Sequence, residues 1–489
     1  MKRVSPSRIG ITLLVLAVAL VGSASAFAQA PAALPDNAAG KTVAAYLAAF
    51  NSGEDAKLRA FFTEHCSAEA LASVPAEARL KRNRQLREQV VRLDLRQVVE
   101  AGDTGVTILA QARGGDWVRL GFEFEEAPQH GLVAIRVEPA DAPEENPAPP
   151  PANDAELVKA IDAYLDKLVK ADEFSGVVLV ARGDAPIYLR AFGLADRGLG
   201  VPNRTDTKFN LGSINKLFTA ISISQLLEAG KLAVTDTIGK FLPGYPNRDA
   251  AARVTVQHLL EMRSGIGDFF NDRFAATPKD RIRSIADYLP LFADQPLAFE
   301  PGTQNAYSNG GYVVLGAIIE KASGQDYYDY VREHIFAPLG MTGTDSYQAD
   351  AIVPNLAQGY SRPQPGEPLR SNIYTRPARG SSAGGGYSTA EDMLRFGVAL
   401  ERGKLVDAKT VRVVFGEMWP ASPGEGLLAG RVSGGWAGGA PGINAYLETD
   451  AKAGTTIVSL ANLSPPAAGR VARKIQAWLT PTPPPRPAK

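Results

Sequence analysis

Hydrophobic positions divide the chain into two stretches with different patterns. In the first stretch, apolar residues recur at helical spacing from Val43 to Phe50, and after Leu95 the pattern changes to strand-like runs at 106–112 and 117–124. A period near 3.6 indicates an amphipathic helix, and short apolar or alternating runs indicate strands. The first stretch therefore predicts helices followed by strands, as in a small α+β unit.

The second stretch begins and ends with strands and helices. A helical pattern opens it, two strands follow around a Gly183-Asp184 turn, and near its end another strand pair precedes a final helix. These elements are predicted at 156–168, 176–181, 187–192, 444–448, 455–461 and 467–479. Because the long middle is mostly helical, the order favours an antiparallel sheet covered by helices, with a helical subdomain inserted.

Proline-rich segments mark the borders of these stretches. Residues 141–153 contain Pro143, Pro147, Pro149, Pro150 and Pro151. Proline removes a backbone donor and favours an extended spacer. We therefore expect a linker at 141–153 between a small domain at 35–140 and a larger one at 154–480. The proline-rich end, 481–489, is expected to be a disordered tail.

The first thirty residues have the order of a secretory signal peptide. Basic residues at 2, 3 and 8 precede an apolar run at 11–21, and small residues follow. We expect residues 1–28 to be removed by cleavage after Ala28, with an uncleaved anchor as the alternative. The mature protein is then expected to be periplasmic or secreted, without a stable membrane span.

Composition and charge exclude several classes of protein. Hydrophobic residues make up 45% of the chain and charged residues 21%, and Lys plus Arg and Asp plus Glu are both 52. Such a chain is of the folded globular type, and it has no net charge with which to hold nucleic acid. One cysteine, Cys66, and four histidines without close spacing predict neither an internal disulfide nor a metal centre. No cofactor is expected.

A serine and a lysine three positions apart are the first candidates for chemistry. Ser213 and Lys216 begin a predicted helix, on which residues three apart share one face. A serine hydroxyl needs a neighbouring base to become a nucleophile, and burial lowers the pKa of a lysine toward that role. The backbone N–H at a helix start also stabilises an oxyanion. By themselves, the two residues fit an exposed helix start with a solvated lysine better than a catalytic pair.

Tyr307 and Asn309 form a second candidate pair in a turn-rich loop at 301–312. From such a loop both side chains can face one cavity, where a tyrosine relays a proton and an asparagine amide donates to the substrate. A plain surface loop is the alternative. Tyr245-Pro246-Asn247 has the same spacing nearer the serine, but its central proline is typical of a turn.

These segments together resemble the serine β-lactamase and penicillin-binding-protein superfamily, most closely the branch of class C β-lactamases, D-alanyl-D-alanine carboxypeptidases and esterases. The resemblance covers about 174–479 and includes the two motifs above together with His258-Leu259-Leu260, Ser264-Gly265-Ile266, Pro338-Leu339-Gly340-Met341 and residues 384–393. It implies a β-lactamase/transpeptidase-like α+β fold, with an antiparallel sheet flanked by helices. It also implies that Ser213 is the acylated nucleophile, Lys216 its proton partner, Tyr307 the second acid/base group and Asn309 a substrate contact.

One segment departs from the family. Where the family carries Lys-Thr-Gly or His-x-Gly on the strand lining the cleft, this chain has Trp436-Ala437-Gly438, followed by Gly439. This strand lacks the cation and hydroxyl expected to bind a substrate carboxylate, while the indole offers apolar area and one N–H. Trp436, Gly438 and Gly439 are expected to contact substrate, and the N–H groups of Gly439 and Ser213 are the expected oxyanion hole. Lys452-Ala453-Gly454, a possible substitute, fits a hairpin turn instead.

A competing hydrolase motif occurs at 380–384, where Gly-Ser-Ser-Ala-Gly matches the nucleophile elbow of α/β-hydrolases. That fold needs its histidine after the serine in the chain, whereas the last histidine, His334, precedes Ser382. We therefore expect this segment to be a glycine loop that borders the cleft. His258 is expected to be structural rather than catalytic.

The domain at 35–140 weakly resembles the cone-shaped folds of cystatin-like and nuclear-transport-factor-like domains, and the resemblance concerns the fold alone. Its Glu123, Glu125 and Glu126 are expected to be a solvated strand edge, because carboxylates are mostly exposed. No catalytic group is expected in this domain.

Two functional hypotheses follow from the sequence. The first is an exported serine hydrolase that forms an acyl-enzyme on Ser213 with a small-molecule ester, amide or β-lactam, with esters favoured because of the altered strand around Trp436. The alternative is a catalytically silent protein of the same fold that binds peptidoglycan or a protein partner.

Overall fold

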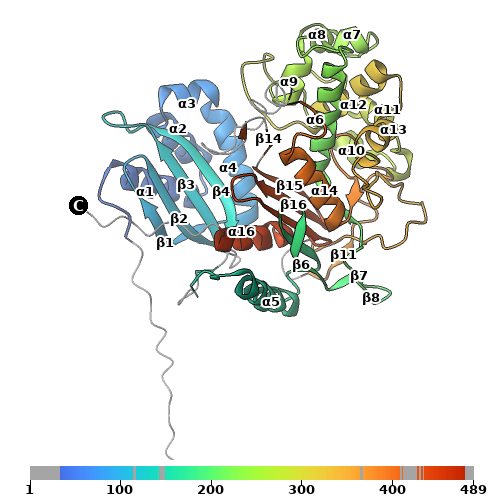
Figure 1. The fold of residues 1–489 in the computed structure, drawn as a ribbon. Coiled ribbons are helices and arrows are strands. Elements are labelled where there is room, and N and C mark those ends of the chain that lie inside the picture. Colours follow the sequence, from blue (N-terminus) through green and yellow to red (C-terminus); the bar gives the residue numbers. More distant parts are fainter. Residues whose placement is uncertain are drawn as a thin grey trace, which may run out of the picture.

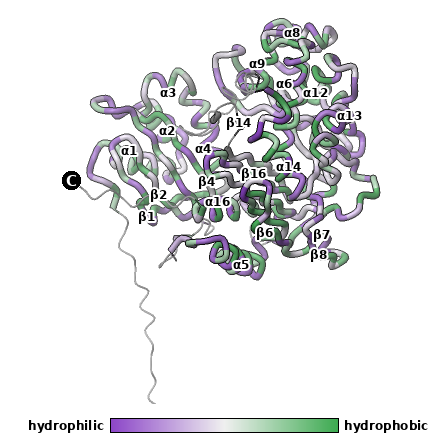
Figure 2. Tube along the Cα trace, viewed as in Figure 1, coloured by the Kyte–Doolittle hydropathy of each residue, from purple (hydrophilic) through white to green (hydrophobic). Residues whose placement is uncertain are grey.

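The computed structural model describes residues 33–113, 117–140, 142–143, 149–363, 367–407, 410, 427–428, 431–432 and 434–479. The expected signal peptide and tail lie outside these residues, as do residues 141 and 144–148 of the expected linker. Within the described part, no helix combines the length and the apolar character needed to cross a bilayer. Figure 2 shows how hydrophilic and hydrophobic segments alternate along the chain.

The amino-terminal part folds as helices followed by strands, in the order that its pattern predicts (Figure 1). Its elements are α1 (Ala38–Asn51), α2 (Asp55–His65), α3 (Ala68–Ser73), α4 (Ala76–Val90), β1 (Leu93–Ala101), β2 (Gly105–Ala112), β3 (Trp117–Phe124) and β4 (Leu132–Ala140). The strands form one antiparallel sheet in the order β1-β2-β3-β4. Tyr46 of α1 lies 5.5 Å from the ring of Phe61 and 5.4 Å from that of Phe122. These rings join α1, α2 and β3 in a core whose buried members all fall between Ala39 and Leu132.

The two ends of the larger part form one antiparallel sheet, in the order β15-β16-β17-β5-β6. The predicted antiparallel sheet with flanking helices is therefore confirmed. Its strands and the helices next to them are α5 (Asp154–Lys170), β5 (Gly176–Arg182), β6 (Ala185–Phe192), β15 (Gly434–Ala440), β16 (Ile443–Asp450), β17 (Thr455–Ala461) and α16 (Ala467–Leu479).

Both faces of the central strands are buried, which explains their continuous apolar runs. On one face, Val178 and Ile457 pack with the apolar sides of α5 and α16. On the other face, Leu179 and Val458 join the main core, to which α14 (Ala390–Glu401) contributes Phe396. The sheet is thus the middle layer between two layers of helices.

The long middle of the chain forms the helical subdomain, which Figure 1 shows in green and yellow beside the sheet. Its central helices, α6 (Asn215–Glu228) and α12 (Asn309–Ser323), contact each other and are buried along most of their length. The shorter helices are α7 (Ile238–Phe241), α8 (Arg248–Arg253), α9 (Val256–Leu260), α10 (Asp272–Ala276), α11 (Ile285–Tyr288) and α13 (Tyr327–Val331), with 3-10 turns η1 (Gly212–Ile214), η2 (Lys279–Arg281) and η3 (Leu289–Leu291) and a π-helical turn η4 (Arg332–Phe336).

Short strand pairs connect this subdomain to the sheet. They are β7 (Leu194–Asp196) with β8 (Val201–Pro202), β9 (Phe209–Asn210) with β12 (Tyr387–Ser388), β10 (Tyr360–Ser361) with β11 (Arg370–Ser371), and β13 (Leu427–Leu428) with β14 (Arg431–Val432). The β9–β12 pair matters for function because it brings two segments far apart in sequence to one place, directly before η1.

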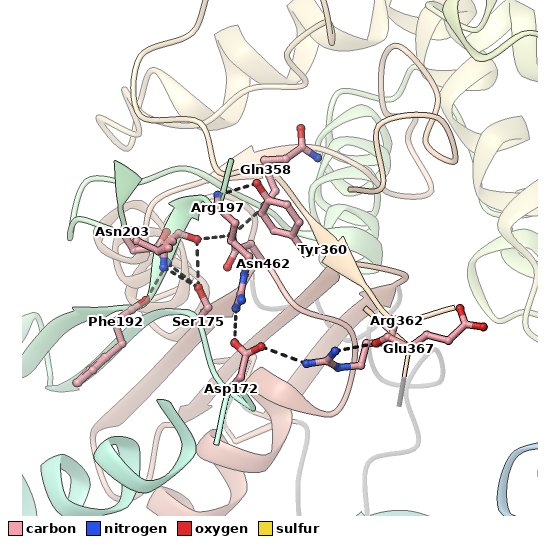
Figure 3. A network of polar contacts seen from close by, with 11 residues as sticks. Asp172, Ser175, Phe192, Arg197, Asn203, Gln358, Tyr360, Arg362, Glu367 and Asn462 are labelled. Carbon is pink, nitrogen blue, oxygen red and sulfur yellow. Dashed lines mark hydrogen bonds and ion pairs between the residues drawn. The ribbon is translucent and has the colours of Figure 1, made fainter. Parts of the chain in front are cut away.

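A polar network fastens the connecting loops to the end of the sheet (Figure 3). Asp172 accepts hydrogen bonds from Arg197 at 2.5 Å and from Arg362 at 3.2 Å. The backbone N–H of Arg197 donates to the Tyr360 hydroxyl at 2.8 Å, and the backbone N–H of Tyr360 donates to the carbonyl of Asn462 at 2.8 Å. The network therefore joins the segments before β5, after β17 and around β10.

Candidate active site

Ser213 lies in η1, the turn that joins strand β9 to helix α6. The Asn210 side chain accepts a hydrogen bond from the N–H of Gly212 at 2.9 Å, and Gly212 has a φ of +50°. The sequence predicts a helix starting at the serine, whereas the α-helix itself starts at Asn215. Because the 3-10 turn runs directly into the helix, Ser213 and Lys216 still lie one turn apart.

Lys216 is buried beside the serine, with 2% of its surface exposed. Its Nζ lies 3.3 Å from Ser213 Oγ, 2.7 Å from Asn309 Oδ1 and 2.6 Å from the carbonyl oxygen of Ala383. Burial lowers the pKa of Lys216 to about 7, and the negative charge of Asp268 opposes this shift. A neutral amine has two N–H donors and one lone pair. It can donate to Ala383 and Asn309 while its lone pair accepts the proton of Ser213.

Tyr307 approaches the serine from the other side. Its hydroxyl donates to Ser213 Oγ at 2.7 Å, and its ring centre lies 4.7 Å from Lys216 Nζ. Desolvation raises the pKa of Tyr307, the hydrogen bond with Ser213 lowers it, and the charge of Asp268 raises it further. With a raised pKa, the phenol keeps its proton at neutral pH and is available as a hydrogen donor to Ser213 or to a group leaving from it.

Asn309 connects the lysine to a carboxylate that the sequence did not single out. It is the first residue of α12, which is capped by the Ser308 side chain. Its Nδ2 donates to Asp268 Oδ2 at 2.7 Å while its Oδ1 accepts from Lys216. Asp268 therefore fixes the orientation of the amide. Its only signal in the sequence is its place two residues after the Ser264-Gly265-Ile266 motif.

We expect Asp268→Asn to shift the pH dependence of hydrolysis. The negative charge of Asp268 raises the pKa of Lys216, so its removal lowers that pKa, and the acidic limb of the kcat/KM profile should move to lower pH. Asp268→Ala also removes the acceptor for Asn309 and should lower kcat about tenfold. Kinetics between pH 5 and 9 measure both effects, with Asp272→Asn, an exposed carboxylate on α10, as the control. An unmoved acidic limb in both Asp268 variants would contradict the role of this charge.

The strand that departs from the family motif turns its tryptophan inward. Trp436 is 8% exposed and belongs to the main hydrophobic core. A Cβ built on Gly438 would lie 1.9 Å from the carbonyl oxygen of Leu211 and 2.8 Å from the backbone N of Ser213. Of the three residues expected on this strand to contact substrate, Gly439 lines the cavity described below, and Trp436 and Gly438 are not among its lining residues.

Close packing of glycines brings the two expected oxyanion donors together. A Cβ on Gly212 would lie 2.9 Å from the backbone N of Gly439, so the chain before Ser213 and strand β15 touch through their backbones. This approach places the N–H-bearing backbones of Ser213 and Gly439 next to each other at the wall of the cavity.

The competing motifs have structural roles in this fold. Ser382 of the Gly-x-Ser-x-Gly segment is fully buried, and its hydroxyl donates to the carbonyl of Tyr312 at 2.8 Å. Tyr245 is 3% exposed, and Asn247 caps helix α8. His258 closes a capping box at the start of α9, and Lys452 lies in the turn between β16 and β17. None of these side chains lines the cavity at Ser213.

A cavity of about 640 Å³ opens beside Ser213, between the sheet and the helical subdomain. Aromatic side chains form much of its wall, and Gly380, Ala383, Gly384 and Gly385 border it as the predicted glycine loop. The aromatic members are Phe269, Phe270, Phe274, Tyr288, Tyr307, Tyr347 and Tyr387. Among the described residues, no group of three His, Cys, Asp or Glu side chains is arranged to hold a metal ion.

Known proteins are similar to the larger part of the chain in sequence and in fold. The family model described as Beta-lactamase matches residues 161–481. Penicillin-binding protein 4* of Bacillus subtilis (strain 168) is 31% identical over 309 residues, which are 57% of this chain and 67% of that protein. Esterase EstB of Burkholderia gladioli is 32% identical over 277 residues, 49% of this chain and 69% of the esterase. The crystal structure of a penicillin binding protein from Bacillus halodurans aligns with a TM-score of 0.56 at 30% identity, covering 64% of this chain and 98% of that one.

Proposed function

The chain belongs to the beta-lactamase family, and from this membership and the surroundings of Ser213 we propose that it is a serine hydrolase. It acts through an acyl-enzyme on ester, amide or β-lactam substrates, and esters are favoured. Relatives in this family carry the names of penicillin-binding proteins and of an esterase, so membership supports the reaction type more than the substrate.

One observation carries the proposal: a buried lysine amine lies 3.3 Å from the serine hydroxyl, with its pKa lowered to about 7. A structural lysine at this depth would be expected to pair with a carboxylate. Instead, Lys216 Nζ contacts the neutral oxygens of Ser213, Asn309 and Ala383. Such surroundings favour an uncharged amine, which is the form that accepts a proton.

Acylation begins with proton transfer from Ser213 Oγ to Lys216 Nζ. The oxygen attacks the substrate carbonyl carbon, a new Oγ–C bond forms, and the carbonyl oxygen takes the negative charge. The N–H groups of Ser213 and Gly439 stabilise that oxyanion. When the carbon–leaving-group bond breaks, the leaving group receives a proton through Tyr307, which stays protonated because its pKa is raised.

Deacylation repeats these steps with water. Lys216 Nζ takes a proton from a water molecule that attacks the ester carbonyl carbon on Ser213, and the Oγ–C bond breaks as the acid is released. Ser213 recovers its proton, so that the protein returns to its starting state.

Esters are favoured because of strand β15. Its Trp436-Ala437-Gly438 segment offers neither a cation nor a hydroxyl to a substrate carboxylate, and Trp436 is buried in the core. A substrate that depends on such donors, as the family's carboxypeptidase and β-lactam substrates do, loses part of its binding. An activated ester needs only the nucleophile, the oxyanion donors and an apolar surface.

The proposal extends to the other parts of the chain. Residues 1–28 direct export to the periplasm or the medium, and residues 35–140 form a separate small domain joined by the 141–153 linker to the hydrolase domain at 154–480. The support is the charge and apolar pattern of the first residues and the separate hydrophobic cores before and after the linker. Sequencing of the exported protein tests the first point, since it should begin at Gln29.

Mass spectrometry of the intact protein tests the acyl-enzyme. After incubation with a fluorophosphonate, one label should attach to Ser213, and a slowly hydrolysed 4-nitrophenyl ester should add one acyl group there and release a burst of 4-nitrophenol. Ser213→Ala should take neither label, while Ser382→Ala, in the competing motif, should take both. A folded wild-type protein that is unlabelled by both reagents would overturn the proposal and favour a silent binding protein.

A further inference from the structure

Among the described residues that line the cavity at Ser213, Arg376 is the only one with a formal charge. It is half-buried on the segment between β11 and β12. Its Nη1 donates to the Tyr387 hydroxyl at 2.7 Å, and its guanidinium carbon lies 6.0 Å from the centre of that ring. A guanidinium carries five N–H donors, so most of its donors are still available at the cavity wall.

No carboxylate of the described residues pairs with Arg376. Asp345, which is bridged to Tyr387 through the backbone, is bound by Arg332 at 3.1 Å. Asp268, on the aromatic side of the cavity, accepts from Asn309. These two carboxylates thus have other partners, and no carboxylate of the described residues serves as a counterion for Arg376 at the wall of this largely apolar cavity. Burying a charge in this way is costly unless a ligand neutralises it.

The segment that carries Arg376 is held at both ends across the cavity. At one end, Asn372 Nδ2 donates to the carbonyl oxygen of Pro441 at 3.0 Å, just after β15. At the other end, the N–H of Ala378 donates to the carbonyl oxygen of Lys279 at 2.8 Å, in the helical subdomain. The chain on both sides of Arg376 is therefore anchored to the two parts of the fold that form the site.

A direct structural path also relates Arg376 to the nucleophile. Tyr387, which accepts its hydrogen bond, lies in β12 and pairs with Asn210 of β9. Asn210 in turn accepts from Gly212, the residue before Ser213. These contacts link the Arg376 guanidinium to the turn that carries Ser213, and a specificity site needs such support from neighbouring residues.

The other wall of the cavity is aromatic. The rings of Phe269 and Phe270 lie 4.3 Å apart, and Phe274 packs 5.1 Å from Phe270 and 5.7 Å from Phe269. Phe270 is also 56% exposed, although large apolar side chains are seldom left open without a partner. The cavity thus offers an apolar surface and one cation to the same bound molecule.

We propose that Arg376 binds a carboxylate of the substrate, and that the substrates are esters combining an apolar or aromatic group with one free carboxylate. The inference rests on the proposed function. A single planar guanidinium matches a single carboxylate through two parallel hydrogen bonds. A phosphate dianion would keep one charge uncompensated, because the described residues that line the cavity include no second permanent cation.

Matched esters test this assignment by activity. In the first pair, 4-nitrophenyl glutarate monoester and 4-nitrophenyl pentanoate, the carboxylate of the charged member lies on the acyl group. In the second pair, 3-carboxy-4-nitrophenyl acetate and 4-nitrophenyl acetate, it lies on the leaving group. Wild type should prefer the charged member of at least one pair, and Arg376→Gln should lower that preference about tenfold or more. Arg376→Lys should keep part of it. Arg370→Gln, which removes an exposed charge from the same segment, should keep all of it.

Binding without turnover separates this inference from the proposed function. In Ser213→Ala, calorimetry should find 3-phenylpropanoate bound about tenfold or more tighter than 3-phenylpropanamide, and Ser213→Ala/Arg376→Gln should bind both alike. If wild type hydrolyses no ester but this difference in binding persists, the proposed function fails and the carboxylate site stands. If esters are hydrolysed while neither measurement depends on Arg376 in folded protein, the carboxylate site is wrong and the hydrolase stands.

Discussion

A Lys216→Met variant is expected to hydrolyse 4-nitrophenyl esters about a thousandfold more slowly than the wild type. Methionine fills a similar volume but has no amine to take the proton from Ser213, and general base catalysis typically contributes factors of this size. For the wild type, kcat/KM should rise with pH around a midpoint near 7, where the pKa of Lys216 lies. The Lys216→Met variant should lack this rise of kcat/KM with pH, and steady-state kinetics between pH 5 and 9 will measure the difference.

The same substitution should stabilise the folded protein. In the unfolded chain a lysine keeps its proton up to about pH 10.4, whereas in the fold burial lowers the pKa of Lys216 to about 7. Between these values the unfolded state binds one more proton, so the free energy of unfolding of the wild type should rise with pH from about 7 to about 10. Below pH 7 Lys216 is charged in both the folded and the unfolded state, and the free energy of unfolding is lowered by the full cost of burying that charge.

Lys216→Met removes that cost and its pH dependence. We expect the variant to be more stable at pH 6 by on the order of 1–4 kcal/mol, as found when buried charges are replaced by apolar side chains. Urea unfolding at pH 6 and pH 9 compares it with wild type and with Lys231→Met, an exposed control just beyond α6. A Lys216→Met variant that keeps wild-type activity, or a wild type whose activity is flat across pH 7, would show that Lys216 is not the base.

Gly438→Ala is expected to lower kcat/KM about a hundredfold or more with the catalytic side chains intact. The added Cβ would lie 1.9 Å from the carbonyl oxygen of Leu211 and 2.8 Å from the backbone N of Ser213. Strand β15 must therefore move away from the serine turn, taking the N–H of Gly439 with it. Loss of one oxyanion donor typically costs a factor of about 10²–10³, and overpacking costs about 1–3 kcal/mol of stability.

The kinetics and urea unfolding of Gly438→Ala should be compared with those of a second glycine variant. Gly244→Ala places its Cβ in open space and should leave both activity and stability near the wild-type values. The rate of fluorophosphonate labelling should fall in Gly438→Ala while Ser213 is still present. If Gly438→Ala turns over esters at the wild-type rate, the N–H of Gly439 is not part of the oxyanion hole.

Local periodicity was enough to predict the elements around the site. The predicted strand pairs at both ends of the larger part and the predicted final helix at 467–479 agree with β5, β6, β16, β17 and α16. They were predictable because the conformation of such segments follows from their own hydrophobic pattern and the turns that bound them. The turn between Ser213 and Lys216 was predictable for the same reason, since residues three apart share a helix face whatever the rest of the fold does.

The direction in which side chains point at the site, and their burial, were not predictable from local periodicity. The sequence predicts that Trp436 contacts substrate, whereas its indole belongs to the main core. A strand side chain points to one of two faces, and which face is buried depends on what packs there. The contacts of Asp268 and Arg376 were not predictable for a related reason: their partners, Asn309 and Tyr387, are distant in sequence and meet them only in the fold.

The order of residues alone determined which chemical groups are available: a serine one turn from a lysine, a tyrosine two residues before an asparagine, and glycines where two backbones meet. Only the tertiary structure decided the state of those groups. The pKa of the lysine is lowered because segments from separate parts of the chain remove water from around it, and desolvation destabilises its charged form. Loss of solvent is a property of the packed chain as a whole, and no short stretch of sequence records it.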